Sequence, residues 1–298
     1  MYSYALSLAH IGNFVTPEVV PALRRTKFRN YELSFVTCIE DSTDEQARLS
    51  SRLTRELIAE GTIRPASVHL PFQGANLCWD PSCLEETQRR EVSQRFIRLI
   101  REHADLMAPM ATLHASNEPP LSEHPKRIDQ VCRTIEEMIP VAEELNFVIN
   151  VEFLPRSCVG NCVEELQQIV SRFDASRVGV CLDVNHLMGR WRELPQIIDT
   201  LAPRIRSFHL NDYDGVDEMH WMPGQGILDW PAVMRRIRAI EHDVLLILET
   251  GKQMKWEWSK RLADPYFTLR HNERACWFLE NCEELLPRMA EFQLPGNA

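Results

Sequence analysis

Short apolar runs alternate with longer amphipathic segments along most of this chain. The runs are rich in Val, Ile and Leu, whereas the amphipathic segments repeat apolar residues at intervals of three and four. The runs predict buried strands and the amphipathic segments predict helices that pack through one face. Strands are expected at 4–8, 31–35, 66–70, 111–114, 148–153, 178–182, 205–210 and 244–248, and helices at 44–60, 85–107, 126–145 and 163–173, among others.

Eight alternating strand and helix units in 298 residues are what a single (β/α)₈ barrel requires. A doubly wound sheet usually has fewer strands and a glycine-rich first turn, whereas the first turn here, LAHIGNF, has one glycine. No low-complexity stretch or Pro/Gly/Ser linker divides the chain. The sequence therefore predicts an α/β fold with one TIM-barrel domain over 1–298, a strand core over about 4–249 and a C-terminal lid or helical segment over about 252–298.

Four of the expected strands end in a side chain that can bind a metal. These are Glu152, Asp183, His209 and Glu249, at the ends of the fifth to eighth strands. A carboxylate there costs several kcal/mol unless a cation or hydrogen bonds compensate it. Any one of them could be a helix N-cap or part of a buried ion pair. Four at equivalent positions meet at one barrel mouth, where active sites are built, and so predict a metal site.

Three carboxylates and one imidazole suit a divalent ion. Oxygen-rich ligation favours the harder ions Mn²⁺ and Mg²⁺, and the imidazole keeps Co²⁺ and Zn²⁺ open. Among these ions we expect Mn²⁺ first. Such an ion could acidify the carbon between a carbonyl and a hydroxyl and stabilise the enediolate that forms on proton loss.

Composition excludes several classes of protein. The chain is 44% hydrophobic, and its N-terminus, MYSYALSLAH, lacks the features of a signal peptide. We expect a cytoplasmic protein that does not enter a membrane. Nine cysteines, an odd number without a paired CxxC arrangement, indicate reduced thiols. The net charge of −10 disfavours nucleic acid as a partner.

The motifs VHLPF, LHAS, VEFLPR, GVCLDVNH, FHLND, PGQGILDW and LLILETG resemble, in this order, the sugar phosphate isomerase/epimerase superfamily. These xylose isomerase-like barrels also include endonuclease IV, and the resemblance runs from Val68 to Gly251. It implies that Glu152, Asp183, His209 and Glu249 bind a divalent metal. It also implies that Glu152 and Glu249 act as an acid/base pair in a sugar isomerase or epimerase.

Two departures from the ketohexose 3-epimerases bear on the substrate. Those enzymes tend to have a further Glu and an Arg where this chain has Cys158 and Gly215. A free ketohexose is therefore disfavoured, and we expect a sugar or a keto-sugar derivative. Arg156 could bind a carboxylate, a phosphate or a hydroxyl, or form a surface salt bridge. A homo-oligomer is compatible with the aromatic C-terminal segment.

Four further histidines keep a second interpretation open. Together with Glu218 and the four predicted metal ligands, these histidines resemble the multi-zinc cluster of endonuclease IV, which would imply a phosphodiesterase. We assign these four, His69, His114, His186 and His220, to substrate-binding roles. A sugar or inosose dehydratase would use the same enolate chemistry, and a barrel that only binds its ligand is a third class of function.

Overall fold

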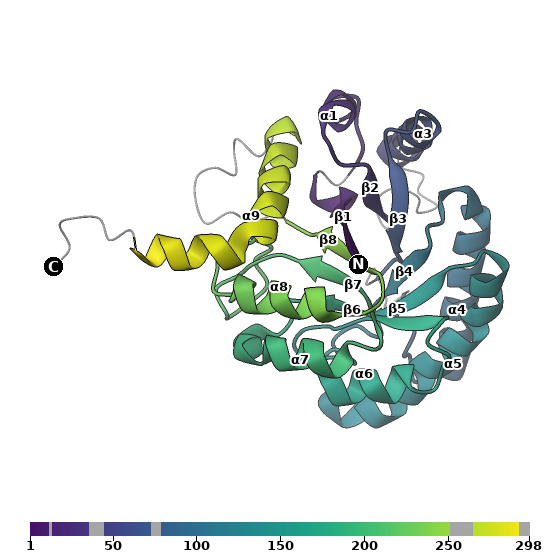
Figure 1. The fold of residues 1–298 in the computed structure, drawn as a ribbon. Coiled ribbons are helices and arrows are strands. Elements are labelled where there is room, and N and C mark those ends of the chain that lie inside the picture. The colour runs from purple at the N-terminus through teal and green to yellow at the C-terminus, as the bar shows by residue number, and fades with distance from the viewer. Residues whose placement is uncertain (12–13, 36–44, 73–78, 251–264, 292–298) are drawn as a thin grey trace.

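The computed structural model of the chain describes residues 1–11, 14–35, 45–72, 79–250 and 265–291. Its eight strands are parallel and close into a barrel in sequence order, with β8 paired to β1 (Figure 1). The strands are β1 Tyr2–Ser7, β2 Asn30–Ser34, β3 Arg64–His69, β4 Met110–Leu113, β5 Val148–Glu152, β6 Val178–Asp183, β7 Ile205–Leu210 and β8 Val244–Leu248. All eight predicted strands are present, and the predicted (β/α)₈ barrel is confirmed.

Helices form an outer ring around the barrel (Figure 1). They are α1 Val20–Arg25, α3 Glu45–Ala59, α4 Glu86–Glu102, α5 His124–Glu144, α6 Val163–Val170, α7 Leu194–Leu201, α8 Trp230–Ala239 and α9 Pro265–Glu291. The four helices predicted by range are present. The helix predicted over 85–107 ends earlier, at Glu102, because His103 leaves the helical region at φ −119° and a 3₁₀ turn, η3 Ala104–Leu106, follows.

The C-terminal helix α9 packs between α8 and α1 and completes the ring. The Thr26 hydroxyl, just after α1, donates to the Glu273 carboxylate at 2.8 Å, and Thr250 donates to Asn272 at 2.7 Å. The helix α9 lies within the C-terminal segment of about 252–298 for which a lid or helices were expected, and residues 252–264 lie outside the described residues. Within the described ranges, no helix has the length and apolar character needed to cross a bilayer.

The two faces of each strand have different neighbours. Side chains such as Ile149, Val180 and Phe208 point outward and belong to the large apolar core under the helices. A small apolar cluster of Ala5, Leu245 and Ile247 lies separately from that core. Ile247 precedes Glu249 by two residues, so alternation places both on the inner face. The barrel interior is thus apolar beneath part of the mouth and charged at the mouth.

A register shift between β6 and β7 aligns inward-facing side chains at the mouth. Between β6 and β7, Val180 pairs with Ile205 but Cys181 pairs with Ser207, so one residue of β7 is skipped. This shift places Asp183 directly opposite His209. Irregularities of this kind re-aim side chains next to active sites.

Candidate active site

A cavity of about 490 Å³ opens at the carboxyl ends of the strands. Nineteen residues from many of the strand ends and following loops line it, among them Ser7, His10, Ser34, Phe72, Glu118 and Cys158. All five residues that we expected to bind substrate, His69, His114, Arg156, His186 and His220, line this cavity. So do Glu152 and Glu249, whereas Asp183 and His209 have no exposed surface.

The four predicted metal ligands meet around one nitrogen. The His209 Nδ1 atom lies 3.1 Å from Glu152 Oε1, 3.7 Å from Asp183 Oδ2 and 3.6 Å from Glu249 Oε2. The four side chains come from four adjacent strand ends, so the barrel brings together residues that are far apart in sequence. An ion bound among them would have three carboxylate oxygens and one imidazole nitrogen.

The chemistry of this donor set fits a divalent cation. Asp183 Oδ2 is buried and accepts no hydrogen bond from any part of the chain that the structure describes. A buried carboxylate oxygen without a donor is rare and costly, and a bound ion is one way to satisfy it. Three carboxylates also share one imidazole, which leaves an excess of negative charge for a cation to neutralise.

The carboxylates and His209 perturb one another strongly. Burial lowers the pKa of His209, but the Cys181 sulfur and the surrounding carboxylates outweigh it and hold that pKa well above its usual value. Burial opposes ionisation of Glu152 and Glu249 as well. Neighbouring imidazoles nevertheless hold the pKa of both carboxyls well below their usual range. The cluster therefore favours ionised carboxylates.

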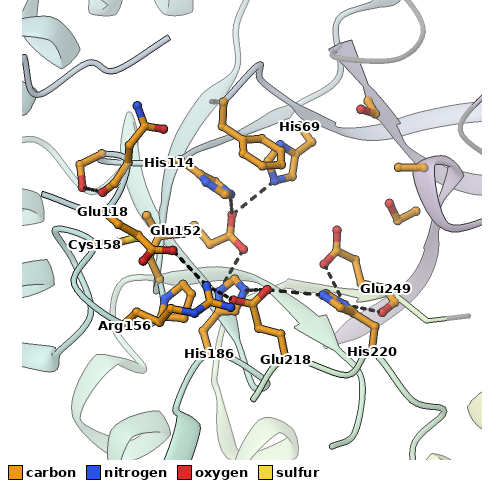
Figure 2. Close-up of a pocket in the computed structure, with 18 of the residues that line it drawn as sticks. His69, His114, Glu118, Glu152, Arg156, Cys158, His186, Glu218, His220 and Glu249 are labelled. Carbon is orange, nitrogen blue, oxygen red and sulfur yellow. Dashed lines mark hydrogen bonds and ion pairs between the residues drawn. The ribbon is translucent and has the colours of Figure 1, made fainter. Parts of the chain in front are cut away.

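The second oxygen of Glu152 faces two histidines on one side of the cavity. Glu152 Oε2 lies 2.8 Å from His114 Nε2 and 3.4 Å from His69 Nε2 (Figure 2). Burial lowers the pKa of His114. It has the same tendency at His69, but the interaction with Glu152 and the charge of Glu32 together outweigh it and raise the pKa of His69 to about 9. Glu152 thus lies between the predicted metal site and His69, which carries a proton on the cavity wall.

Glu249 has a similar arrangement on the other side. Its Oε1 atom lies 3.5 Å from His10 Nε2, and its Oε2 atom lies 3.8 Å from His220 Nδ1. The His10 and His220 rings lie 4.9 Å apart. Each of the two glutamates therefore has one oxygen towards His209 and the other towards a second histidine. A carboxylate held in this way can exchange a proton with a substrate and with its histidine neighbour.

Backbone carbonyls orient three of the cavity histidines. The Nδ1 atoms of His69, His186 and His220 lie 2.9, 2.8 and 3.0 Å from the carbonyl oxygens of Leu70, Phe153 and Glu249. A carbonyl oxygen only accepts, so each Nδ1 carries the proton. Each Nε2 is then directed away from that carbonyl. In a neutral ring this leaves Nε2 as the nitrogen that could bind a metal or accept from a substrate hydroxyl, whereas a protonated His69 donates from Nε2 towards Glu152.

Arg156 lies at the rim of the cavity, where acidic groups surround it. Its guanidinium is 2.8 Å from Glu218 and 3.2 Å from Glu118 (Figure 2). It also lies 3.0 Å from Asp217. The surface salt bridge considered from sequence is therefore present. The Glu218 carboxylate also faces His186 and His220, with Oε2 3.8 and 4.0 Å from their Nε2 atoms.

The loop after β7 is built around the buried Asp212. Its carboxylate accepts hydrogen bonds from four donors, the main-chain N–H groups of Tyr213, Gly224 and Leu228 and the Trp230 indole. A side chain at Gly226 would overlap the Asp212 carboxylate and the Tyr213 backbone. The glycines of PGQG therefore allow close packing of a loop that holds Glu218 and His220.

Sequence reasoning missed two contributors to the site. Glu32, at 0% exposure in β2, lies 3.3 Å from His209 Nε2, and His10 reaches Glu249 from the 3₁₀ turn η1 Leu8–His10. The signal for Glu32 was a lone acid inside the apolar run YELSF. His10 follows β1 in the segment LAHIGNF, as His69 ends β3, and could have been found in the same way.

Comparisons with known proteins agree with the barrel fold. An uncharacterized protein of Methanocaldococcus jannaschii is 24% identical over 208 residues, which cover 68% of this chain and 70% of the relative. D-psicose 3-epimerase from Clostridium cellulolyticum superposes with a TM-score of 0.72 at 14% identity and covers 94% of this chain and 99% of its own. For 3-keto-D-glucoside 4-epimerase from E. coli the TM-score is 0.65 at 14% identity, with coverages of 91% and 99%. Residues 20–265 match the family described as the xylose isomerase-like TIM barrel. The chain belongs to the xylose isomerase-like TIM barrel family.

Proposed function

We propose that this protein is a divalent-metal-dependent isomerase or epimerase that acts on a sugar or a keto-sugar derivative. The observation that carries the proposal is the pair Glu152 and Glu249, each with one oxygen towards His209 and the other towards a histidine. Glu152, Asp183, His209 and Glu249 would hold the ion, and Mn²⁺ is our first candidate because the set is rich in oxygen.

The two glutamates would do the proton chemistry. A divalent cation in this site would polarise a substrate carbonyl and acidify the adjacent carbon. One glutamate would remove the proton, and the other would return a proton from its own side of the cavity. His114 and His10 lie against their distal oxygens, where they can orient each carboxylate and pass its proton onward. The same residues could serve a dehydratase, which would expel a hydroxide in place of the second proton transfer.

The proposed substrate class follows from the cavity and from Cys158 and Gly215, the two positions at which this chain departs from the ketohexose 3-epimerases. Cys158 lines the cavity, and burial raises the pKa of its thiol to about 12, so it offers no charge to a substrate. Gly215 has φ +82° and packs against Trp191. A cavity of about 490 Å³ holds a monosaccharide with room for a substituent. The names of two structural neighbours, a 3-epimerase of psicose and a 4-epimerase of a keto-glucoside, agree with a keto-sugar substrate.

The experiment that tests the proposal combines metal content with solvent exchange. Purified protein would be stripped, titrated with Mn²⁺ and incubated in D₂O with a panel of free and glycosidic keto sugars. We expect about one ion per chain and deuterium incorporation next to the carbonyl, with exchange lost in both Glu152→Gln and Glu249→Gln. Glu241→Gln, at an exposed position outside the cavity, serves as the matched control. Stoichiometric metal binding without deuterium incorporation into any sugar of the panel would count against an isomerase.

A second candidate function is an endonuclease IV-like phosphodiesterase with several zinc ions. The favouring observation is that His69 and His114 converge on Glu152, while His186 and His220 both face Glu218. Two or three Zn²⁺ per chain, with one lost in His69→Ala, would support it over the isomerase. Cleavage of DNA at abasic sites would then be the assay. The net charge of −10 argues against this candidate.

A further inference from the structure

The carboxylate of Glu32 is buried inside the barrel beneath the cavity mouth. It comes from the middle of β2 and has 0% exposure. Its Oε2 atom accepts hydrogen bonds from Ser67 Oγ at 2.9 Å and from Thr112 Oγ1 at 3.3 Å. The same atom lies 3.3 Å from His209 Nε2, and Oε1 is also 3.3 Å from that nitrogen. Two hydroxyls from neighbouring strands therefore hold the carboxylate against the far edge of the His209 ring.

A register shift places these groups together. Tyr31 pairs with Pro65, but the next residue, Glu32, pairs with Ser67, so Ala66 is skipped between β2 and β3. Without the shift, Glu32 would lie opposite Ala66, which has no donor. The bulge supplies Glu32 with a hydroxyl donor and directs both residues into the barrel.

The two nitrogens of His209 then have distinct neighbours. Nδ1 faces the oxygens of Glu152, Asp183 and Glu249, whereas Nε2 faces Glu32. An ionised carboxylate only accepts hydrogen bonds, so a proton on Nε2 is stabilised by Glu32. A neutral imidazole with its proton on Nε2 has its lone pair on Nδ1. That lone pair points at the place where the three other carboxylates converge.

We propose that Glu32 is a positioning residue that fixes the tautomer and orientation of His209 for a divalent cation. This inference rests on the proposed metal site at His209. A carboxylate that accepts the remote N–H of a metal-bound histidine fixes the ring and raises its basicity, and loss of such a partner typically weakens metal binding 10- to 100-fold. A neutral amide at position 32 would keep the shape and a hydrogen bond but remove the charge.

The burial of a fourth carboxylate in one cluster supports this role. Ser67 and Thr112 could be satisfied by a neutral acceptor at lower desolvation cost. A buried carboxylate is tolerated where donors or a cation compensate it, and besides the two hydroxyls Glu32 faces the His209 ring. A cation bound at the other ring nitrogen would strengthen the Nε2–H donor, so the ion and Glu32 would stabilise each other through His209.

The test compares Glu32→Gln with a matched control, Glu165→Gln, which removes the same charge from a carboxylate 2.7 Å from His124, a histidine that does not line the cavity. Metal-stripped full-length proteins would be titrated with Mn²⁺ by calorimetry. We expect wild type and Glu165→Gln to agree within about threefold and Glu32→Gln to bind 10- to 100-fold more weakly. Equal affinity in Glu32→Gln and wild type would overturn the proposal. Absence of Mn²⁺ binding in the wild type would instead overturn the proposed metal site.

A second measurement reports the tautomer of His209 directly. Long-range ¹H–¹⁵N spectra of Zn²⁺-loaded protein labelled at histidine report which ring nitrogen carries the proton. We expect His209 to be protonated on Nε2 and its Nε2–H resonance to move upfield in Glu32→Gln, because the hydrogen bond to a neutral amide is weaker. A His209 ring protonated on Nδ1 would overturn the proposal. So would weaker metal binding in Glu32→Gln with an unmoved Nε2–H resonance, since Glu32 would then not act through the His209 ring.

Discussion

Replacement of Asp212 by Asn tests whether the loop after β7 depends on one buried carboxylate. Asp212 is fully buried, and each of its two carboxylate oxygens accepts two hydrogen bonds. Oδ1 accepts from the Tyr213 and Leu228 main chain at 3.0 and 3.3 Å, and Oδ2 accepts from Gly224 and the Trp230 indole at 2.9 and 2.8 Å. Asn keeps the shape but turns one oxygen into an NH₂ donor.

The cost follows from the number of donors that lose an acceptor. In either amide orientation the NH₂ group faces two N–H donors, so two hydrogen bonds to a charged acceptor are lost. Each such bond contributes about 1.5–3 kcal/mol, which gives a loss of roughly 3–6 kcal/mol in the free energy of unfolding. The site is affected as well, because this loop holds Glu218 and His220.

Urea unfolding followed by tryptophan fluorescence would measure this loss at pH 8. The matched control is Asp229→Asn, since Asp229 is an exposed N-cap of α8 that accepts from Ala232 at 3.1 Å. Asn caps a helix about as well as Asp, so the control should change stability by less than about 1 kcal/mol. A loss below about 1 kcal/mol for Asp212→Asn would refute the role assigned to its four hydrogen bonds.

Three further predictions concern the same site. Gly226→Ala should destabilise the protein in thermal unfolding, because the new Cβ overlaps Asp212 and Tyr213, and an unchanged melting temperature would contradict that packing. Removal of divalent metal with EDTA should lower the unfolding free energy by roughly 2.7 kcal/mol relative to protein with free Mn²⁺ at 100 times Kd, and no difference would exclude a tight site in the folded state. Burial raises the pKa of the Cys158 thiol from 9.0 to about 12. Its alkylation by iodoacetamide, followed by peptide mass spectrometry, should therefore be slow at pH 8 and accelerate as the pH rises. Rapid labelling at pH 8 would contradict this prediction, because it would show that the thiol is accessible and ionised.

The sequence by itself determined the architecture and the predicted metal ligands. A parallel barrel strand is apolar throughout, so the runs that end in Glu152, Asp183 and Glu249 are visible as apolar segments broken by one charge. Once eight such runs alternate with amphipathic helices, closure into a barrel makes their carboxyl ends neighbours. Both conclusions depend on local pattern and topology alone.

Only the tertiary structure decided which neighbours each ligand has across the barrel. Glu32 and His209 are 177 residues apart, and the contact between them depends on strand pairing that shifts by one residue beside Glu32. The roles of the two oxygens of Glu249, with His10 on one of them, likewise depend on where η1 turns back towards the mouth. Sequence patterns report which side chains face inward, but register, bulges and ring orientation arise from packing of the whole barrel. These features decide that His209 Nδ1 faces Glu152, Asp183 and Glu249 while Nε2 faces Glu32.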